Sequence, residues 1–392
     1  MFKTEQKLLE IINKYKNILF LFVISVLGLV IRLQGIHFIS YDMSHFLIPW
    51  YNTIAEKGGF HSLKGQVGDY NILYQTFVAS ITYLHKNCVV LYKLLSIFFD
   101  YALAISTGAF CMKLSKKKDF FVFSVAYSII LFLPTVLFDS SYWGQCDSIY
   151  TTFVILTLLF MFDERYMLSF IMLGIAFSFK FQTIFIVPFI VCYYICKKQF
   201  SILYFFVSVA VFWISGIPAY LNGRSLLTPF KIYSSQTETY QSMSLNIPNF
   251  WNLTGGDYKS LHTFAIVLTI ALCGIGLYFA MSDKLKLENA LSYVSTATWF
   301  VWTCLLFLPA MHERYTYLLD ILLVVLVFLD NKYLKYAVVS VMLNIMTYCH
   351  FLFGTPFTLI QWCSIAYIIS WSHFTYTLIT TSNNNDLMTS NE

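Results

Sequence analysis

LHTFAIVLTIALCGIGLYFAM, residues 261–281, is an apolar stretch without Asp, Glu, Lys or Arg. A helix that crosses a membrane needs about 20 mostly apolar residues, and this stretch has that length. Similar stretches recur along the 392-residue chain, in which 58% of residues are apolar and 11% are charged, whereas soluble proteins carry about 25% charged residues. The apolar stretches are too many and too long for the core of a soluble domain, so the sequence predicts an all-α, polytopic transmembrane protein.

Hydropathy predicts about twelve transmembrane helices. Their expected ranges are 17–35, 88–112, 119–138, 148–162, 166–180, 181–196, 200–219, 261–281, 290–309, 316–330, 334–352 and 356–376. Residues 1–16 are amphipathic and are expected to lie on the membrane surface. A single transmembrane domain then covers residues 17–376, and the polar, low-complexity tail over 377–392 is expected to lack regular structure.

The basic residues predict the orientation of the chain, because cytoplasmic loops are enriched in Lys and Arg. If the N-terminus is cytoplasmic, the loops on that side contain Lys3, Lys7, Lys14, Lys16, Lys113, Lys116, Lys117, Lys118, Arg165, Lys197, Lys198, Lys284, Lys286, Lys332 and Lys335. We therefore expect a multi-pass protein of the cell membrane with both termini in the cytoplasm. Two long loops, 36–87 and 220–260, then face outward, and the first contains apolar periodic stretches that predict interfacial helices.

Several classes of site are not indicated. The chain contains no HExxH, CxxC, Walker A or DxD motif, so neither a metal nor a cofactor is predicted. The nine cysteines lie mostly in apolar segments and are interpreted as small hydrophobic residues. The net charge of +5 is small and is not gathered on one face, so no nucleic-acid partner is expected.

Polar residues that could carry out chemistry gather in the predicted outer segments. Asp42, His45, Asp69, Tyr70 and Asn71 lie in the first loop, Asp139, Trp143, Gln145 and Asp147 in DSSYWGQCDS, Lys180 and Gln182 at the tip of the fifth and sixth spans, and His312, Glu313 and Arg314 in PAMHERY. The second long loop adds Gln236, Tyr240, Asn246, Asn249 and Trp251. A function on the outer side, near the membrane surface, is therefore expected.

Each cluster also has a structural interpretation. Asp42, a carboxylate just outside a span, suits a general base, and Asp69 is either its rival or a residue that braces the loop. Lys180 is either a lysine that extends to the membrane surface or a functional cation in an apolar hairpin. The turn at 312–314 is either closed by an ion pair or forms an anion site, in which Arg314 binds phosphate.

Three further residues have interpretations of their own. Trp143 is expected to belong to the aromatic belt at the membrane boundary. Asp147 is equally compatible with a binding role and with the end of a span. Asp100 lies near the middle of span 88–112, where an ionisable side chain is costly. We expect Asp100 to have a structural role, with a partner on a neighbouring helix that the sequence does not identify.

Five segments in order resemble the bacterial membrane glycosyltransferases of the GT-C superfamily that are related to the GPI mannosyltransferase II group. The segments, from about residue 38 to 317, are SYDMSHFLIPWYNTIAEKGGFHSL with GDYN, SSYWGQCDSIY, FSFKFQTIFIVPF, SLNIPNFWNLTG and PAMHERYTY. The chain departs from the pattern in having no soluble domain after the last span, so the resemblance implies that the outer loops recognise the acceptor.

The resemblance implies an inverting enzyme that moves a monosaccharide, a hexose, from a polyprenyl-phosphate carrier to a cell-surface glycan or lipid-linked acceptor on the extracytoplasmic face. By this resemblance Asp42 is the base, and Asp69 is the alternative. The cations implied to bind the carrier phosphate are Lys180, His312 and Arg314. The residues implied to bind sugar or acceptor hydroxyls are Gln145, Asp147, Gln182, Asn246 and Asn249.

Three other functions compete with this one. A transporter or flippase for lipid-linked sugars would need a polar path through both halves of the membrane, whereas polar residues here gather on one side. A membrane acyltransferase would need a buried catalytic histidine, whereas His312 lies in a short turn beside Arg314. A polysaccharide polymerase would share the site chemistry and stays an alternative.

Overall fold

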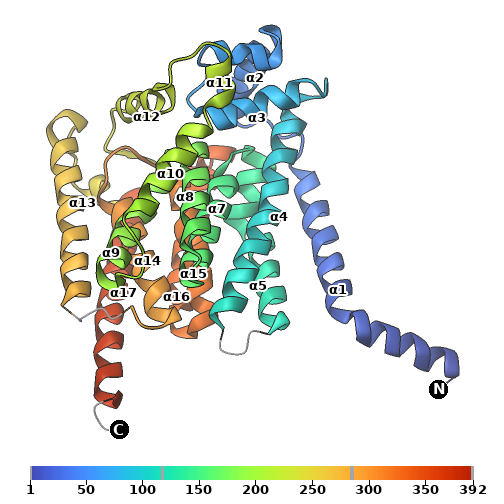
Figure 1. The fold of residues 1–392 in the computed structure, drawn as a ribbon, viewed down its shortest axis with the longest axis vertical. Helices are drawn as coiled ribbons and strands as arrows, with labels where there is room; N and C mark the ends of the chain where they lie inside the picture. Colours follow the sequence, from blue (N-terminus) through green and yellow to red (C-terminus); the bar gives the residue numbers. More distant parts are fainter. Residues whose placement is uncertain (1, 116–118, 283–286, 390–392) are drawn as a thin grey trace.

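The computed structural model describes residues 2–115, 119–282 and 287–389, which form a bundle of helices (Figure 1). The helices of the first half are α1 (Lys3–Gln34), α2 (Ile48–Glu56), α3 (Ile72–Thr82), α4 (Cys88–Leu114), α5 (Phe120–Phe132), α6 (Pro134–Leu137), α7 (Asp147–Phe162), α8 (Tyr166–Phe179) and α9 (Val187–Lys197). The helices of the second half are α10 (Leu203–Ile214), α11 (Ile217–Leu221), α12 (Thr228–Thr239), α13 (Tyr258–Met281), α14 (Ala290–Phe307), α15 (Tyr317–Leu329), α16 (Leu334–Phe353) and α17 (Ile360–Thr389). Two short strands, β1 (Ser244–Leu245) and β2 (Met311–His312), pair in parallel. The all-α prediction is confirmed.

Polar side chains cap the ends of several apolar helices. The Asn87 side chain accepts a hydrogen bond of 3.0 Å from the Val89 amide at the start of α4. Asp119 accepts one of 3.0 Å from the Phe121 amide at the start of α5. Side-chain acceptors of this kind satisfy amides that have no partner within the helix. α8 ends at Phe179, and the C-cap residue Lys180 has an extended backbone (φ −150°, ψ 134°).

Five helices in the described ranges are long and apolar enough to cross a membrane. They are Thr4–Gln34, Cys88–Leu114, Tyr258–Met281, Ala290–Phe307 and Asn331–Phe353. A sixth crossing results if Phe120–Phe132 and Pro134–Trp143, which meet at 54°, form one bent span. Twelve spans are not confirmed, because helices such as α8 (14 residues) and α10 (12 residues) are short. At 1.5 Å per residue they cover about 18–21 Å of a hydrocarbon core of about 30 Å.

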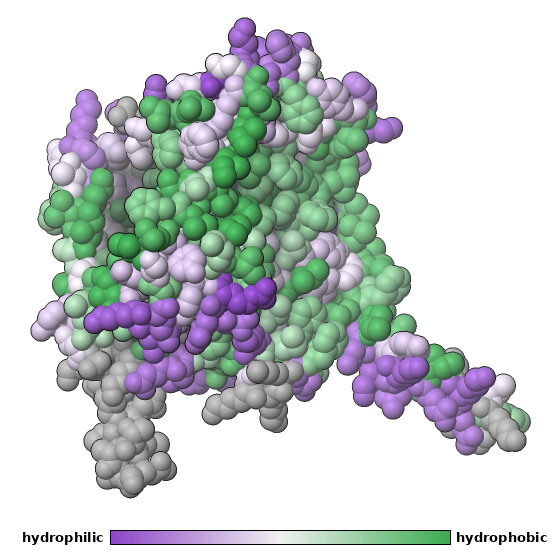
Figure 2. Space-filling view, in the orientation of Figure 1, coloured by the Kyte–Doolittle hydropathy of each residue, from purple (hydrophilic) through white to green (hydrophobic). Residues whose placement is uncertain are grey.

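Apolar side chains cover much of the outside of the bundle. Figure 2 shows a broad hydrophobic region across the middle of the visible face, with hydrophilic residues gathered toward the two ends. On the candidate spans, Phe98 is 66% exposed, Val267 58% and Ile270 66%. Soluble monomers rarely expose large contiguous apolar surfaces, whereas a bilayer favours them. The chain is therefore a membrane protein with several spanning helices.

Short helices form a cap at one end of the bundle. α2, α3, α11 and α12 lie together at the top of Figure 1. They come largely from the two long loops predicted by the sequence, so these loops are partly helical. The N-terminal end of α1 and the C-terminal end of α17 lie toward the opposite end (Figure 1).

The two terminal segments are largely helical. α1 begins at Lys3, so most of the amphipathic segment 1–16 continues directly into the first span, and its N-terminal end points away from the bundle (Figure 1). α17 continues to Thr389, although the sequence predicts no regular structure in this tail. Extending an existing helix needs no new nucleation step, which accounts for helix in a polar sequence. Residues 390–392 lie outside the described ranges, as do Lys116, Lys117, Lys118, Lys284 and Lys286.

A buried ion pair joins α1 to α4. Arg32 Nε lies 2.7 Å from Asp100 Oδ2, and both side chains are fully buried. The Ser140 hydroxyl donates to the same oxygen at 2.5 Å, and the Ser141 hydroxyl donates to the Arg32 carbonyl at 2.6 Å. The prediction that Asp100 has a structural partner on a neighbouring helix is confirmed, and that partner is Arg32.

Asp100→Asn is expected to destabilise the protein by roughly 3–5 kcal/mol, because it leaves the Arg32 charge buried without a counter-ion. The matched control is Asp163→Asn, whose partner Lys113 forms an ion pair in which both side chains are about one third exposed. Exposed pairs contribute about 0–1 kcal/mol. Thermal unfolding of the two variants in detergent checks this, and equal losses of stability would contradict it.

Candidate active site

Three side chains from distant parts of the chain contact the carboxylate of Asp42. Asp42 directly precedes η1 (Met43–Leu47), where the chain enters the cap. Trp143 Nε1 and Gln145 Nε2 each donate a hydrogen bond of 2.9 Å to Asp42 Oδ2. Arg314 Nη2 lies 3.4 Å from the same oxygen. All three contacts involve Oδ2, so within the described ranges Oδ1 stays available to another partner.

A glycine turn places two of these donors. Gly144 follows η3 (Phe138–Trp143) in the left-handed conformation, with φ +77°, which costs a residue with a Cβ about 1–2 kcal/mol. Its amide donates a hydrogen bond of 2.9 Å to the Asp139 carbonyl. A Cβ on Gly144 would also lie 2.7 Å from the Met43 side chain. The turn allows Trp143 and Gln145, on either side of the glycine, to reach one carboxylate oxygen.

Gly144→Ala is expected to lower the free energy of unfolding by about 1–2 kcal/mol, because alanine is strained at a positive φ. The control is Gly274→Ala in the middle of α13, where an added Cβ meets nothing within 4 Å and alanine favours the helix by up to about 1 kcal/mol. The two substitutions should therefore shift the melting temperature in opposite directions. A Gly144→Ala protein as stable as the wild type would show that the turn is not constrained.

Tyr70 determines which way the Gln145 amide faces. The Tyr70 hydroxyl donates a hydrogen bond of 2.6 Å to Gln145 Oε1. Because an amide has its acceptor and its donor on opposite sides, this bond directs Nε2 toward Asp42. Gln145 is 3% exposed. The first loop thus contributes a second residue to the site, one that orients the Asp42 contacts without touching the carboxylate.

Arg314 lies among carboxylates and has unused donors. Its guanidinium carbon is 4.9 Å from the centre of a Trp143 ring. Nη1 is 3.9 Å from Asp147 Oδ2, and Nε is 3.9 Å from Glu313 Oε1, so both contacts are too long for hydrogen bonds. Nε and Nη1 are buried and have no hydrogen-bond partner in the described part of the chain. A planar guanidinium with free donors is suited to an anionic oxygen ligand.

Lys180 is paired inside the protein. Its Nζ lies 2.6 Å from Asp147 Oδ1, and the two side chains are 7% and 0% exposed. The ammonium also lies 5.6 Å from the ring centres of Tyr150 and Tyr315. The interpretation of Lys180 as a lysine that extends to the membrane surface is therefore wrong. Asp147, for which the sequence left two interpretations, is the counter-ion of Lys180.

The turn at 312–314 is attached to the second long loop. β2 pairs with β1, and Asn246, at φ +60°, bridges to His312. The Tyr240 ring centre lies 4.5 Å from that of His312. Burial, together with the nearby charges of Arg314 and Lys180, lowers the pKa of His312 to about 3. Among the three residues expected to provide charge to a phosphate, His312 can provide a hydrogen bond but no positive charge at neutral pH.

Burial raises the pKa of Glu313 from 4.5 to about 7, although Arg314 partly opposes the shift. Protonated Glu313 thus favours the folded state below about pH 4.5, and this stabilisation, roughly 3 kcal/mol at most, is lost as the pH rises to about 7. We expect Glu313→Gln, which cannot ionise, to make stability less dependent on pH in this range. Melting temperatures at pH 5 and pH 8 compare the two proteins, and parallel pH profiles would contradict the assignment.

The other residues expected in the site occupy different places. Asp69 lies in the cap, where its backbone carbonyl accepts a hydrogen bond from Gln236, and it makes no described contact with Asp42. Asn249 caps η5 (Phe250–Leu253) by accepting a hydrogen bond of 3.2 Å from the Trp251 amide. Gln182 lies in η4 (Phe181–Ile186), two residues beyond Lys180. The structure therefore brings together Asp42, Gln145, Asp147, Lys180 and Arg314.

Some contributions to the site differ from the sequence interpretation. Trp143 is fully buried and donates to Asp42, so its assignment to an aromatic belt is wrong. Tyr150 and Tyr315 were not singled out by the sequence. Tyr150 lies one helical turn after Asp147, and this spacing was the signal that could have identified it. Asp139 is fully buried, and neither of its carboxylate oxygens has a hydrogen-bond partner in the described ranges.

No protein-family model matches the chain, and no match was found among curated proteins. The geometry of the site combines a carboxylate with one free oxygen, a guanidinium with free donors, and a buried Lys–Asp pair. No group of three or more His, Cys, Asp and Glu side chains in the described ranges is placed to hold a metal ion. The set is suited to proton abstraction beside a bound anion.

Proposed function

We propose that the chain is a membrane glycosyltransferase of the GT-C type that transfers a hexose from a polyprenyl-phosphate carrier to a hydroxyl of a glycan or lipid-linked acceptor. One observation carries the proposal: the carboxylate of Asp42, with Oδ1 free, lies 3.4 Å from a guanidinium that has two unpartnered nitrogens in the described ranges. A base and an anion-binding group are the two requirements of sugar transfer from a phosphate leaving group.

In the proposed reaction, Asp42 Oδ1 accepts the proton of the acceptor hydroxyl while that oxygen forms a bond to the anomeric carbon. The bond between the anomeric carbon and the phosphate oxygen breaks, and polyprenyl phosphate leaves with the electron pair. Attack on the face opposite the leaving group inverts the configuration of the sugar. The hydrogen bonds from Trp143 and Gln145 to Oδ2 hold the base in a fixed orientation.

The carrier phosphate binds to Arg314 in this proposal. Its unpartnered Nη1 can donate to a phosphate oxygen, and a Trp143 ring centre lies 4.9 Å from the guanidinium carbon, where it favours the cation. Lys180 contributes positive charge near the phosphate without binding it directly, because its ammonium is already bound to Asp147. Asn246, which bridges to His312 next to Arg314, remains a proposed contact to sugar hydroxyls. Gln182 and Asn249 lie elsewhere, and Asn249 caps η5, so neither is part of the proposed site.

We infer that the cap faces the extracytoplasmic side. Lys113, at the C-terminal end of α4, is at the end of the bundle remote from the cap, as are the outer ends of α1 and α17 (Figure 1). Basic residues favour the cytoplasmic side. A lipid carrier whose sugar phosphate lies at the headgroup level would then meet Asp42 and Arg314 directly beneath the cap.

Asp42→Asn is expected to reduce the release of polyprenyl phosphate from a polyprenyl-phosphate hexose by about 10²–10⁴-fold, which is the usual contribution of a general base. The assay uses purified full-length protein with synthetic donors and an acceptor extract. The control is Asp257→Asn, because asparagine caps a helix as well as aspartate does and Asp257 caps α13.

The outcomes separate the candidate functions. Loss of release in Asp42→Asn alone supports the glycosyltransferase and the role of the base. If the wild type releases no polyprenyl phosphate from any common hexose donor, or if Asp42→Asn matches it, the proposed reaction is wrong. Donor that crosses a liposome membrane unchanged would instead indicate a flippase, and repeated addition to one acceptor would indicate a polymerase.

A further inference from the structure

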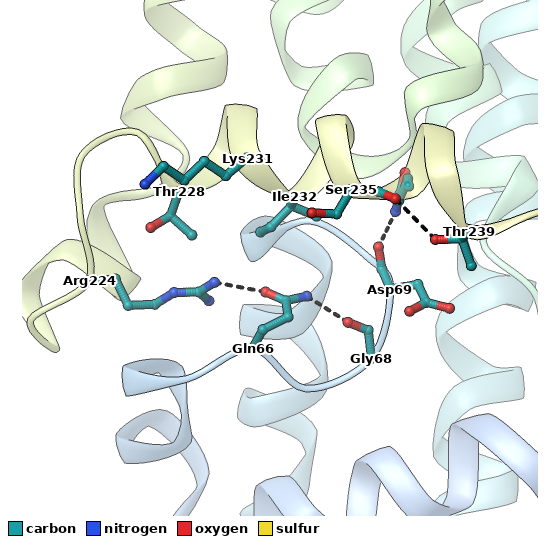
Figure 3. Close-up of a pocket in the computed structure, with 10 residues that line it drawn as sticks. Gln66, Gly68, Asp69, Arg224, Thr228, Lys231, Ile232, Ser235 and Thr239 are labelled. Carbon is teal, nitrogen blue, oxygen red and sulfur yellow. Dashed lines mark hydrogen bonds between the residues drawn. The ribbon is translucent and has the colours of Figure 1, made fainter.

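A pocket of about 370 Å³ lies within the cap (Figure 3). One wall is the segment 66–69 between η2 (Gly59–Lys64) and α3. The other wall is α12, together with Arg224 in the connection from α11. Its volume falls near the lower end of the ~300–1,000 Å³ range of small-molecule sites. None of the side chains that contact Asp42 lines this pocket, so it is a separate feature of the molecule.

Hydrogen bonds hold the two walls together. Arg224 Nη2 donates a bond of 2.9 Å to Gln66 Oε1, and Asn71 Nδ2 donates one of 3.0 Å to the Pro229 carbonyl. The Gln236 side chain donates to the Asp69 carbonyl. Because three bonds at different positions join the two sides of the pocket, the pocket has a defined shape.

The lining is polar and carries a positive balance. Arg224 and Lys231 provide two cations, and Asp69 provides one carboxylate. Arg224 Nη1 is buried and has no hydrogen-bond partner in the described ranges. Of the described lining residues, Ile232 is the only large apolar one, and the others offer hydroxyl and amide groups. Such a lining suits a polyhydroxylated ligand with an acidic group and does not suit a polyprenyl chain.

We propose that this pocket binds an anionic sugar unit, a hexose with a phosphate or carboxylate group, at the end of the acceptor glycan. Arg224 and Lys231 bind the acidic group, while Asp69 and the hydroxyl side chains of α12 bind the sugar hydroxyls. The assignment as an acceptor site rests on the proposed glycosyltransferase function. Binding of an anionic sugar in the pocket is inferred from the lining residues alone.

The pocket is connected to the candidate active site through one peptide bond. Asp69 lines the pocket, and the next residue, Tyr70, donates to Gln145, which in turn donates to Asp42. The Gln66 side chain, bound to Arg224, also donates a bond of 2.9 Å to the Tyr70 carbonyl. A sugar held in the pocket is thus adjacent to Tyr70, which orients Gln145 and through it the base.

Titration of the purified full-length protein with four probes, read by saturation-transfer NMR, tests the proposal. The probes are glucose 6-phosphate, glucuronate, glucose and inorganic phosphate. At least one of the two charged sugars is expected to bind about tenfold more tightly than both glucose and inorganic phosphate, because one charge-assisted hydrogen bond contributes that much. Whichever charged sugar binds identifies the acidic group.

Lys231→Gln is expected to weaken binding of the charged sugar about tenfold and to leave glucose binding unchanged. Arg224→Gln also removes the bond from Arg224 to Gln66, so it is expected to weaken binding of both sugars, and of the charged sugar more strongly. Lys57→Gln is the matched control, because Lys57 is an exposed cap residue outside the pocket. Equal binding of charged and neutral sugars, inorganic phosphate binding as tightly as the sugars, or unchanged binding in both pocket variants would overturn the proposal. A wild type that binds a charged sugar but releases no polyprenyl phosphate would keep the pocket and refute the glycosyltransferase.

Discussion

A charged side chain inside an apolar bundle must meet an opposite charge or a set of hydrogen-bond donors, because leaving it unpaired costs several kcal/mol. This constraint joins distant segments of the chain. The pair between Arg32 and Asp100 fixes the end of α1 against α4, and the pair between Lys180 and Asp147 fixes the end of α8 against α7. The Lys180–Asp147 pair lies where α8 ends and α7 begins, so a bond that secures the bundle also positions residues of the candidate active site. Arg32 lies in the last turn of α1, whereas Asp100 lies near the middle of α4.

The same constraint applies to the connections between helices beneath the cap, where the residues of the candidate site lie. Asp42, Trp143, Gln145 and Arg314 come from three connections between helices, and no helix contributes more than its end to their contacts. Such connections can adopt irregular conformations that suit a binding site, because the helices on either side hold their ends in place. The left-handed Gly144 and the short β1–β2 pairing show how these connections are fixed locally. A rigid bundle with three well-tethered connections can place polar groups where lipid and water meet.

Much of the fold could be read from the sequence, but the number of membrane crossings could not. Apolar stretches predicted helices at nearly all the positions where they occur, since hydropathy and capping residues report local structure. The predicted break at Lys180 agrees with the end of α8 at Phe179, whereas the predicted range 181–196 is divided in the structure between η4 and α9. A short helix buried by its neighbours can have the same composition as a spanning one, so composition alone does not decide whether α7 and α8 cross the membrane.

The sequence indicated which residues could belong to the candidate site more readily than it indicated which of them would contact one another. Asp42 and Arg314 were conspicuous because ionisable residues are rare in this chain, and their proximity is a result of the fold. Trp143 could not be separated from a belt residue, because its burial depends on packing against Tyr348 and Phe351. The neutral state of His312 depends on burial beside two cations, which no local pattern reveals.

In the proposed reaction, the separation between the pocket in the cap and the candidate active site beneath it has a physical rationale. A polyprenyl carrier stays in the bilayer, so its phosphate must be met at the ends of the helices, where Arg314 lies. A glycan acceptor arrives from water, and the pocket beside Arg224 has almost no apolar lining. Tyr70 lies between them, because its backbone is held from the pocket side by Gln66 and its hydroxyl reaches Gln145. A single loop can therefore align an acceptor from one medium with a donor from the other.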